Sequence, residues 1–266
     1  MAGSLAALVL LAGCGALPLG SDSGPSLPPG LSDDDVRNAS ALASAHREIL
    51  RDRSHTVEVT ETVRYENGSL RGSKRATYRV DPASGIATAV VEPTVSGGLF
   101  APPFLPSADT LEFYRNGTTV LARVTNDTTS KRLPVQEPEG SLRSPKMVPT
   151  LLTAMDLQYN GTVERDGETL YRLEATTPED EALVARTVLS GRRYDELRTV
   201  TFRALVTADG LVRRYTVEYA VFKTEGYRFP ETGEGQVIRG TRTVTFGSVG
   251  TTSVERPAWA GNQSAA

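Results

Sequence analysis

Few side chains in this 266-residue chain can act as a nucleophile or as a base near neutral pH, because it contains one cysteine and two histidines. His46 falls on the apolar stripe of a predicted helix and His55 begins a predicted strand, so we expect both in the core or at its boundary. The sequence has no Gly-x-Ser-x-Gly elbow, no phosphate-binding glycine loop and no His-rich metal motif. These features predict a protein that is not an enzyme and that uses neither a metal ion nor a cofactor.

Carboxylates are the remaining candidates for chemistry. Acidic runs occur at 33–35 and 179–181. Both lie in the first turns of predicted helices, where negative charge is favoured by the exposed N–H groups, so we do not expect a calcium site. A pair of carboxylates contributed by distant strands, as in glycosidases, stays open at this point.

The single cysteine, Cys14, ends the sequence Leu-Ala-Gly-Cys at the close of an apolar run over residues 5–11. This arrangement resembles the lipobox of exported lipoproteins, in which a peptidase cuts before the cysteine and the cysteine then carries lipid. The resemblance implies a signal peptide over residues 1–13 and a lipid anchor on Cys14 at the extracytoplasmic face of the cell membrane. No other segment has the roughly 20 apolar residues that span a bilayer, so we expect anchoring without a membrane span.

Composition divides the remaining chain into three parts. Residues 14–31 are rich in Pro, Gly and Ser and predict a lipidated, flexible tether. Residues 32–256 are predicted to form one β-rich domain, and residues 257–266 a disordered tail. A formal net charge of -3 with 23% charged residues argues against a nucleic-acid partner, and a single cysteine excludes an internal disulfide.

Alternation of apolar and polar residues predicts a series of antiparallel hairpins. The predicted strand pairs, each with its turn, are 56–65 with 70–80 (Asn67-Gly68), 111–114 with 120–124 (Asn116-Gly117), 162–164 with 170–175 (Asp166-Gly167) and 200–206 with 215–221 (Asp209-Gly210). A last strand is predicted at 239–246. Asn67, Asn116 and Asn160 each begin both an Asn-Gly pair and a glycosylation sequon. We interpret them first as hairpin turns and second as candidate glycosylation sites.

Helices are few. The clearest is predicted from an N-cap at Ser32 to about Arg51, with apolar residues at helical spacing. Shorter helices are predicted near 149–156, and from Pro178 at the first helical position to before Gly191. The predicted fold is mainly β (α+β): a curved antiparallel meander or open half-barrel, with an N-terminal amphipathic helix and one or two short helices packed on its apolar face.

This layout of lipobox, tether, capped helix and Thr-rich strands resembles a group of haloarchaeal-type surface lipoproteins. More distantly, it resembles the LolA-like carriers of lipoproteins and glycolipids. Their fold is an open half-barrel of antiparallel strands closed by helices over an apolar cavity. The resemblance covers residues 32–255 and rests on the order of elements, so it implies a fold more than a function.

The candidate ligand-binding residues come from the first predicted strand and from an apolar loop. Val57, Val59, Val63 and Tyr65 share one face of the strand, and Glu61 is a charge on that apolar face. Glu61 either protects a sheet edge, the interpretation we favour, or orients a ligand in an apolar pocket. The loop at 97–106 is apolar but too rich in proline for a helix or central strand. It either packs under the sheet or lines the mouth of a cavity through Leu99, Phe100 and Phe104.

The sequence therefore predicts a non-enzymatic, lipid-anchored surface protein that binds or carries a hydrophobic or lipid ligand between sheet and helix. The alternative is a recognition or scaffold module with a packed core, whose Thr- and Arg-rich face binds another envelope protein. A cavity of some hundreds of Å³ on the apolar face would favour the ligand, and close packing would favour the scaffold.

Overall fold

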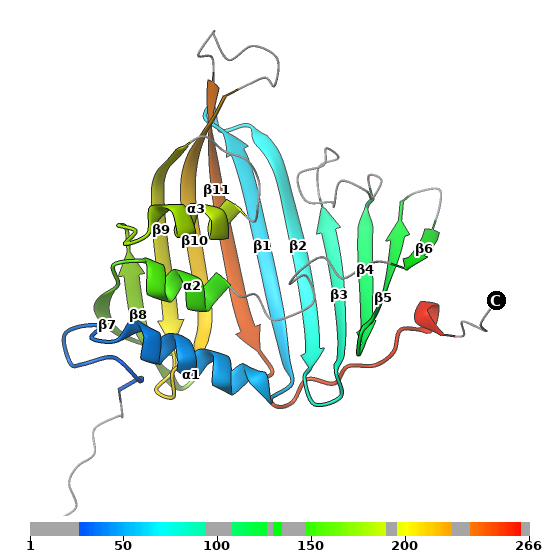
Figure 1. Ribbon diagram of the computed structural model, residues 1–266, viewed down its shortest axis with the longest axis horizontal. Helices are drawn as coiled ribbons and strands as arrows, with labels where there is room; N and C mark the ends of the chain where they lie inside the picture. Colours follow the sequence, from blue (N-terminus) through cyan, green and yellow to red (C-terminus); the bar gives the residue numbers. More distant parts are fainter. Residues whose placement is uncertain are drawn as a thin grey trace, which may run out of the picture.

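The computed structural model describes residues 27–93, 108–126, 130–134, 147–189, 196–224 and 235–261. Within these ranges, eleven strands form one antiparallel sheet in the order β6-β5-β4-β3-β2-β1-β11-β10-β9-β8-β7, and three α-helices lie on one face of it (Figure 1). The sheet is open, with β6 and β7 as its two edges. The predicted fold class, a curved antiparallel half-barrel with helices on one face, is confirmed.

The strands are β1 (His55–Tyr65), β2 (Leu70–Asp81), β3 (Ile86–Pro93), β4 (Thr110–Asn116), β5 (Thr119–Thr125), β6 (Ser130–Pro134), β7 (Gln158–Arg165), β8 (Glu168–Ala175), β9 (Glu196–Val206), β10 (Val212–Thr224) and β11 (Gly235–Gly247). The helices are α1 (Ala39–Arg51), α2 (Met147–Ala154) and α3 (Glu181–Leu189), with a short 3-10 turn, η1 (Ala258–Ala260). The sequence patterns did not predict β3 or β6. Strand β3 is mostly apolar on both faces, so it lacks the alternation that marks the other strands.

Four of the predicted Asn-Gly and Asp-Gly turns join the strands that they were predicted to join. Gly68, Gly117, Gly167 and Gly210 all have positive φ, which glycine adopts without strain. The predicted turn at Asn160-Gly161 is wrong. These residues lie inside β7, where the register against β8 shifts between Tyr159 and Thr162, so the pair forms a β-bulge.

Strand β1 is the centre of the sheet. It pairs with β2 on one side and with β11 on the other, and thereby joins two meanders of consecutive strands, β1–β6 and β7–β11. Glu61 faces Lys74 of β2 and Arg242 of β11 in these ladders. Our interpretation of Glu61 as protection of a sheet edge is therefore wrong, because β1 has no free edge.

The predicted starts of two helices, with Ser32 as an N-cap and Pro178 as a first helical residue, are also wrong. Helix α1 begins after Asn38, whose side-chain oxygen accepts the backbone N–H of Ala41 at 2.9 Å. Ser32 instead closes a turn, since its backbone N–H donates to the carbonyl of Asp35 at 2.8 Å. Helix α3 is capped by Asp180, whose carboxylate accepts the N–H of Leu183 at 2.9 Å. Asn and Asp are as effective as Ser at this position, so cap chemistry alone did not locate these helix starts.

The described fold includes residues on both sides of the predicted domain limits, 32 and 256. Leu27 and Leu31 pack against the main core from the N-terminal side. At the other end, Trp259 of η1 is buried in a small cluster with Tyr114. None of the helices in the described ranges is both long enough and apolar enough to cross a membrane.

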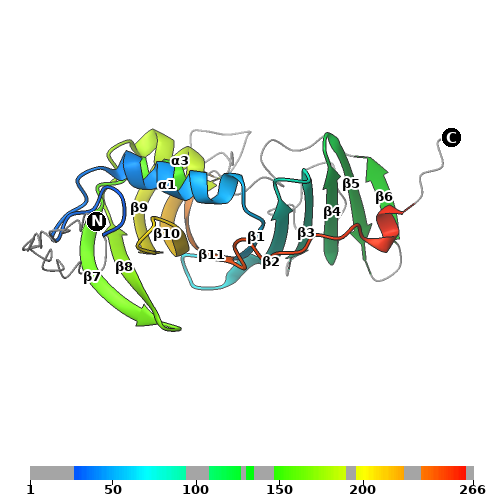
Figure 2. The same ribbon diagram turned by 90° about the horizontal axis from the view of Figure 1, so that it is seen from below.

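The core lies on the inner face of the sheet, which is the face that carries the helices. Figure 2 shows the helix layer over β8 to β11 and reaching the start of β1, while no described α-helix lies over β3 to β6. Buried inner residues nevertheless continue across that second half, from Ala89 on β3 to Phe113 on β4 and Ala122 on β5. The apolar face is thus wider than the described helix layer.

Candidate ligand-binding site

Strand β1 directs the predicted site residues into the interior. Val57, Val59, Glu61 and Val63 are all buried on the inner face, as their alternation predicts. Tyr65 lies at the strand end and is half-buried, with the guanidinium of Arg71 5.6 Å from its ring centre. The remaining predicted site residues, Leu99, Phe100 and Phe104, lie outside the described residues, as does Cys14.

Glu61 is the centre of a buried ionic cluster. Its Oε2 accepts Nη2 of Arg242 at 2.9 Å and Nε at 3.2 Å, and Nζ of Lys74 lies 3.2 Å from the same oxygen. The side chains of Glu61, Arg242 and Lys74 are 0%, 5% and 19% exposed. The three residues form one cross-strand row over β2, β1 and β11, so the sheet register itself brings the charges together. Burial disfavours the charge on Arg242, but Glu61, together with Tyr215 and Tyr219, more than offsets this and holds the pKa of Arg242 above its ordinary value.

Uncharged side chains complete the cluster from two sides. The hydroxyl of Tyr219 donates to Oε1 of Glu61 at 3.4 Å. Helix α2 contributes Met147, whose sulfur contacts Nη1 of Arg242 at 2.8 Å and the hydroxyl of Tyr215 at 3.9 Å. Burial raises the pKa of Tyr215, so this hydroxyl stays protonated.

A glycine makes room for one of these contacts. Gly240 lies on the inner face of β11, opposite Tyr219 of β10. A Cβ at position 240 would stand 2.1 Å from Cζ of Tyr219, so the tyrosine ring lies directly over the glycine. This close approach sets the position from which the Tyr219 hydroxyl reaches Glu61.

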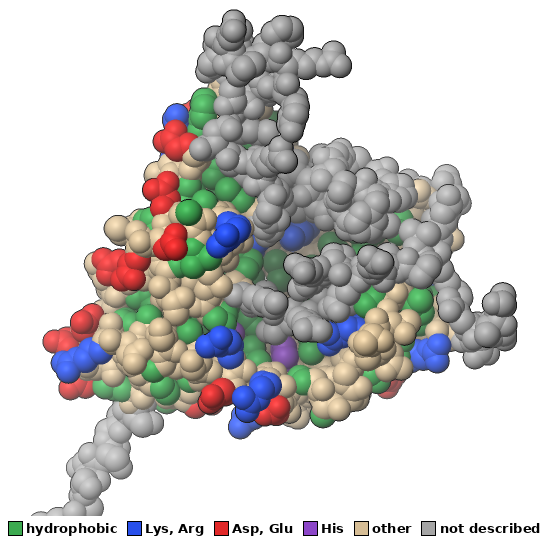
Figure 3. Space-filling view, viewed as in Figure 1, with side chains coloured by type: hydrophobic (Ala, Val, Ile, Leu, Met, Phe, Trp, Pro, Cys, Tyr) green, Lys and Arg blue, Asp and Glu red, His purple; other side chains and the backbone are tan. Residues whose placement is uncertain are grey.

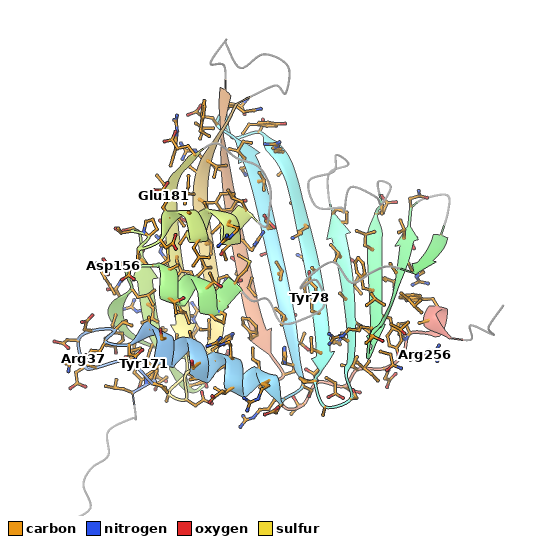
Figure 4. The ribbon with its side chains drawn as sticks, viewed as in Figure 1. Arg37, Tyr78, Asp156, Tyr171, Glu181 and Arg256 are labelled. Atoms are coloured by element: carbon orange, nitrogen blue, oxygen red, sulfur yellow. The ribbon has the colours of Figure 1, made fainter. Side chains whose placement is uncertain are left out.

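A separate apolar row begins at Val57, four residues before Glu61 on β1, and extends into the half of the sheet without a described α-helix. Next to Val57, the row continues through Tyr78, Ala89, Phe113 and Ala122 on β2 to β5. Tyr78, labelled in Figure 4, is half-buried, and burial raises its pKa. Figure 3 shows hydrophobic side chains on this face beside the helices. The alanines are the shortest side chains of the row, so the row has least bulk between Tyr78 and Phe113 and at its end on β5.

The sequence matches a family of unknown function, DUF7537, over residues 2–262. The chain belongs to this family. None of the curated proteins matches it. Among solved structures, the chain is similar to LprF from Mycobacterium bovis, with 13% identity over 84% of this chain and 98% of that one at a TM-score of 0.46. It is also similar to the lipoprotein LppX of Mycobacterium tuberculosis, with 15% identity over 81% of this chain and 97% of that one at a TM-score of 0.45.

Both histidines of this DUF7537 chain are core residues, as predicted. Nδ1 of His46 accepts the backbone N–H of Val212 at 3.2 Å, and its ring stacks edge-on against Phe246 at 5.0 Å. Burial, with a smaller contribution from His55, lowers the pKa of His46 to about 4. His55 is buried and its Nδ1 pairs with the carbonyl of Arg53 at 2.8 Å. Burial also lowers the pKa of His55.

The three candidate glycosylation sites are exposed. Asn67 and Asn116 lie at hairpin turns, and the side chain of Asn67 accepts both the N–H and the hydroxyl of Ser69. Asn160 lies in the bulge of β7 and donates to Glu174 of β8 at 3.3 Å. Their use as glycan acceptors stays a prediction.

Sequence reasoning missed the partners of Glu61. Arg242 lies two positions from Gly240 and from Val244, and Lys74 lies two positions from Ala76, so each cation shares a strand face with small or apolar residues. The same period of two that placed Glu61 on the apolar face therefore placed two cations on apolar faces as well. What the sequence lacked was the pairing of β1 with β11, because the two strands are far apart in the chain.

Proposed function

We propose that this protein is a non-enzymatic, lipid-anchored protein of the extracytoplasmic membrane face that binds an amphipathic lipid on the inner face of its sheet. The observation that carries the proposal is the width of the apolar inner face. It extends over β2 to β5, whereas the described helices lie over the other half. Acyl chains covering that surface would gain about 0.8 kcal/mol per buried CH₂ group.

The ionic cluster supports an amphipathic ligand rather than a purely apolar one. Ligand pockets are mostly apolar, with a few polar groups that fix the ligand's orientation. Glu61, Arg242 and Lys74 supply such a polar centre in the middle of the inner face. Lys74 keeps the most exposure of the three, so a polar headgroup would contact the cluster there while the chains extend along the alanine row.

The absence of catalysis and the membrane anchor are parts of the same proposal. Both histidines, the side chains best suited to acid–base chemistry near neutral pH, are held in core contacts. Cys14 in its lipobox-like setting would keep the binding face close to the membrane. Replacing Cys14 by Ser should move the protein from the membrane fraction to the soluble fraction of the native host.

A substitution that fills the inner face distinguishes a ligand site from a packed scaffold. Ala89→Leu adds bulk between Tyr78 and Phe113 in the half without a described helix. Ala89 is buried, so the added atoms fit only if the side chains around it move apart. If this row opens to admit acyl chains, the free energy of unfolding should change by less than about 1 kcal/mol. Uptake of a fluorescent fatty acid or phospholipid should fall at the same time.

The matched control is Ala43→Leu. Ala43 is buried on α1, in the layer where helices pack on the sheet. The same added bulk there should overpack the core and cost about 1–3 kcal/mol. If Ala89→Leu is as destabilising as Ala43→Leu and the wild type takes up no lipid, the inner face is filled by the protein itself. The scaffold interpretation would then replace the proposal.

A further inference from the structure

A second candidate site lies on the opposite face of the sheet. A groove of about 490 Å³ crosses strands β7 to β10 there. Figure 2 shows the β7–β8 hairpin bending away from the helix layer beside these strands. The charged and amide side chains that line the groove are Arg165, Arg172, Arg203, Arg214, Glu174 and Asn160. Four arginines against one glutamate make this groove basic, in a chain whose formal net charge is -3.

The sheet register sets two of the arginines at a defined separation. Arg172 of β8 pairs with Leu205 of β9, and Leu205 pairs with Arg214 of β10. The two Cα atoms are therefore two strand spacings apart, about 9.6 Å. Half-buried Leu205 forms an apolar floor between them. Both arginines are exposed, and among the described residues no ion pair neutralises either one.

In the adjacent row of the groove, Arg203 already forms ion pairs. Nε of Arg203 donates to Glu174 at 2.8 Å, and its Nη1 lies 3.3 Å from Glu218. Glu174 also accepts the amide of Asn160 at 3.3 Å. At the hairpin, Glu168 pairs with Arg213 at 3.2 Å. The nearby carboxylates are thus engaged with other partners, and the positive charge of the groove is concentrated on Arg172, Arg214 and Arg165.

The β-bulge in β7 positions the side chain of Arg172. Arg172 Nη2 lies 3.5 Å from the position that a Cβ at Gly161 would occupy. Gly161 has φ of +78°, a conformation that glycine adopts without strain. Because Gly161 has no side chain, the guanidinium of Arg172 packs against the backbone of the bulge. This contact limits the conformations of the long Arg172 side chain.

We propose that this groove binds a phosphate group between Arg172 and Arg214. A guanidinium offers parallel N–H donors that match two oxygens of an anion. One carboxylate has two oxygens and is satisfied by one such fork, whereas a phosphate has enough oxygens for two forks from opposite sides. The site is independent of the lipid site proposed above, since it lies on the other face of the sheet.

The test uses the full chain carrying Cys14→Ser, which removes the predicted acylation site. Calorimetric titration with inorganic phosphate or glycerol phosphate tests a soluble ligand. Co-flotation with phosphatidylcholine vesicles, with and without phosphatidylglycerol, tests a lipid headgroup. The double variant R172Q/R214Q should weaken binding by at least about tenfold in whichever arm shows it, because each lost charged contact amounts to about a tenfold change.

The matched control is Arg79→Gln, which removes the same charge from an exposed position of β2, three strands from β10. It should bind like the parent chain. Binding in the soluble arm assigns the site to a free phosphate compound, and binding only to phosphatidylglycerol vesicles assigns it to a headgroup. The proposal is overturned if neither probe binds, if acetate binds as tightly as phosphate, or if R172Q/R214Q binds like Arg79→Gln.

Discussion

Substitutions in the ion pair between Glu61 and Arg242 test two roles of this pair: its effect on the free energy of unfolding, and its effect on lipid binding. Glu61→Leu leaves the Arg242 guanidinium, 5% exposed, without the carboxylate that two of its nitrogens contact. Arg242→Met leaves the fully buried carboxylate of Glu61 with a weaker set of donors. Removing one partner of a buried pair costs about 3–5 kcal/mol, so Glu61→Leu should lose that much stability, whereas Arg242→Met, which keeps Lys74 3.2 Å from Glu61, should lose less.

The double variant E61L/R242M should recover most of this loss. It replaces two of the three charges of the cluster by apolar side chains, a change that is often neutral or stabilising, and it leaves only Lys74, the most exposed of the three. We expect its free energy of unfolding to lie within about 2 kcal/mol of the wild type. Urea unfolding followed by circular dichroism measures all four members of the cycle, provided that the m-values agree.

Two results would refute this reasoning. Single variants within about 1 kcal/mol of the wild type would mean that water reaches the pair, as at a surface salt bridge. A double variant as unstable as the sum of the singles would mean that the two charges are not coupled. If the double variant is stable, it also tests the proposed function, because lipid should then bind more weakly without the polar centre.

Three further predictions concern stability. Since His46 has its pKa lowered from 6.5 to about 4 by burial, its contribution is complete above pH 6.5 and is lost as the pH falls to about 4. The loss amounts to about 3 kcal/mol, and His46→Gln should flatten the unfolding free energy over that pH range. Gly240→Ala should cost about 1–3 kcal/mol by displacing the tyrosine ring above it, whereas Gly247→Ala on the same strand, with open space at its Cβ, should be near neutral. Asn38→Ala should cost about 1 kcal/mol by removing the cap of α1, and thermal unfolding should show Ser32→Ala to be within about 0.5 kcal/mol of the wild type.

Local patterns were sufficient for most of the sheet. The alternation in β1 and the turn at Asn67-Gly68 placed Val57 and Val63 inside, because a period of two and a two-residue hairpin turn fix both face and register. Strand β3 escaped prediction because its apolar residues on both faces hide that period. The Asn-Gly pair at Asn160 looked like a turn, yet it is a bulge, since the same backbone freedom of glycine serves both.

The candidate sites depend on contacts that local patterns do not encode. Glu61 contacts Arg242 because the first strand of the chain pairs with the last. The two residues are 181 positions apart in the sequence. Arg172 and Arg214 likewise share a groove because β8 and β10 flank β9. Periodicity indicated the face that each side chain occupies, while the partners followed from the order of strands in the sheet.

Native mass spectrometry followed by organic extraction tests the central claim, lipid binding on the inner face, most directly. The chain should be expressed from Gly15 onward, because this removes the predicted anchor and keeps Leu27 and Leu31, which pack against the core. We predict a mass shift from added fatty acid, which carries no phosphate, that Ala89→Leu reduces and R172Q/R214Q leaves unchanged. An unshifted mass that persists with added phospholipids and fatty acids would contradict the claim.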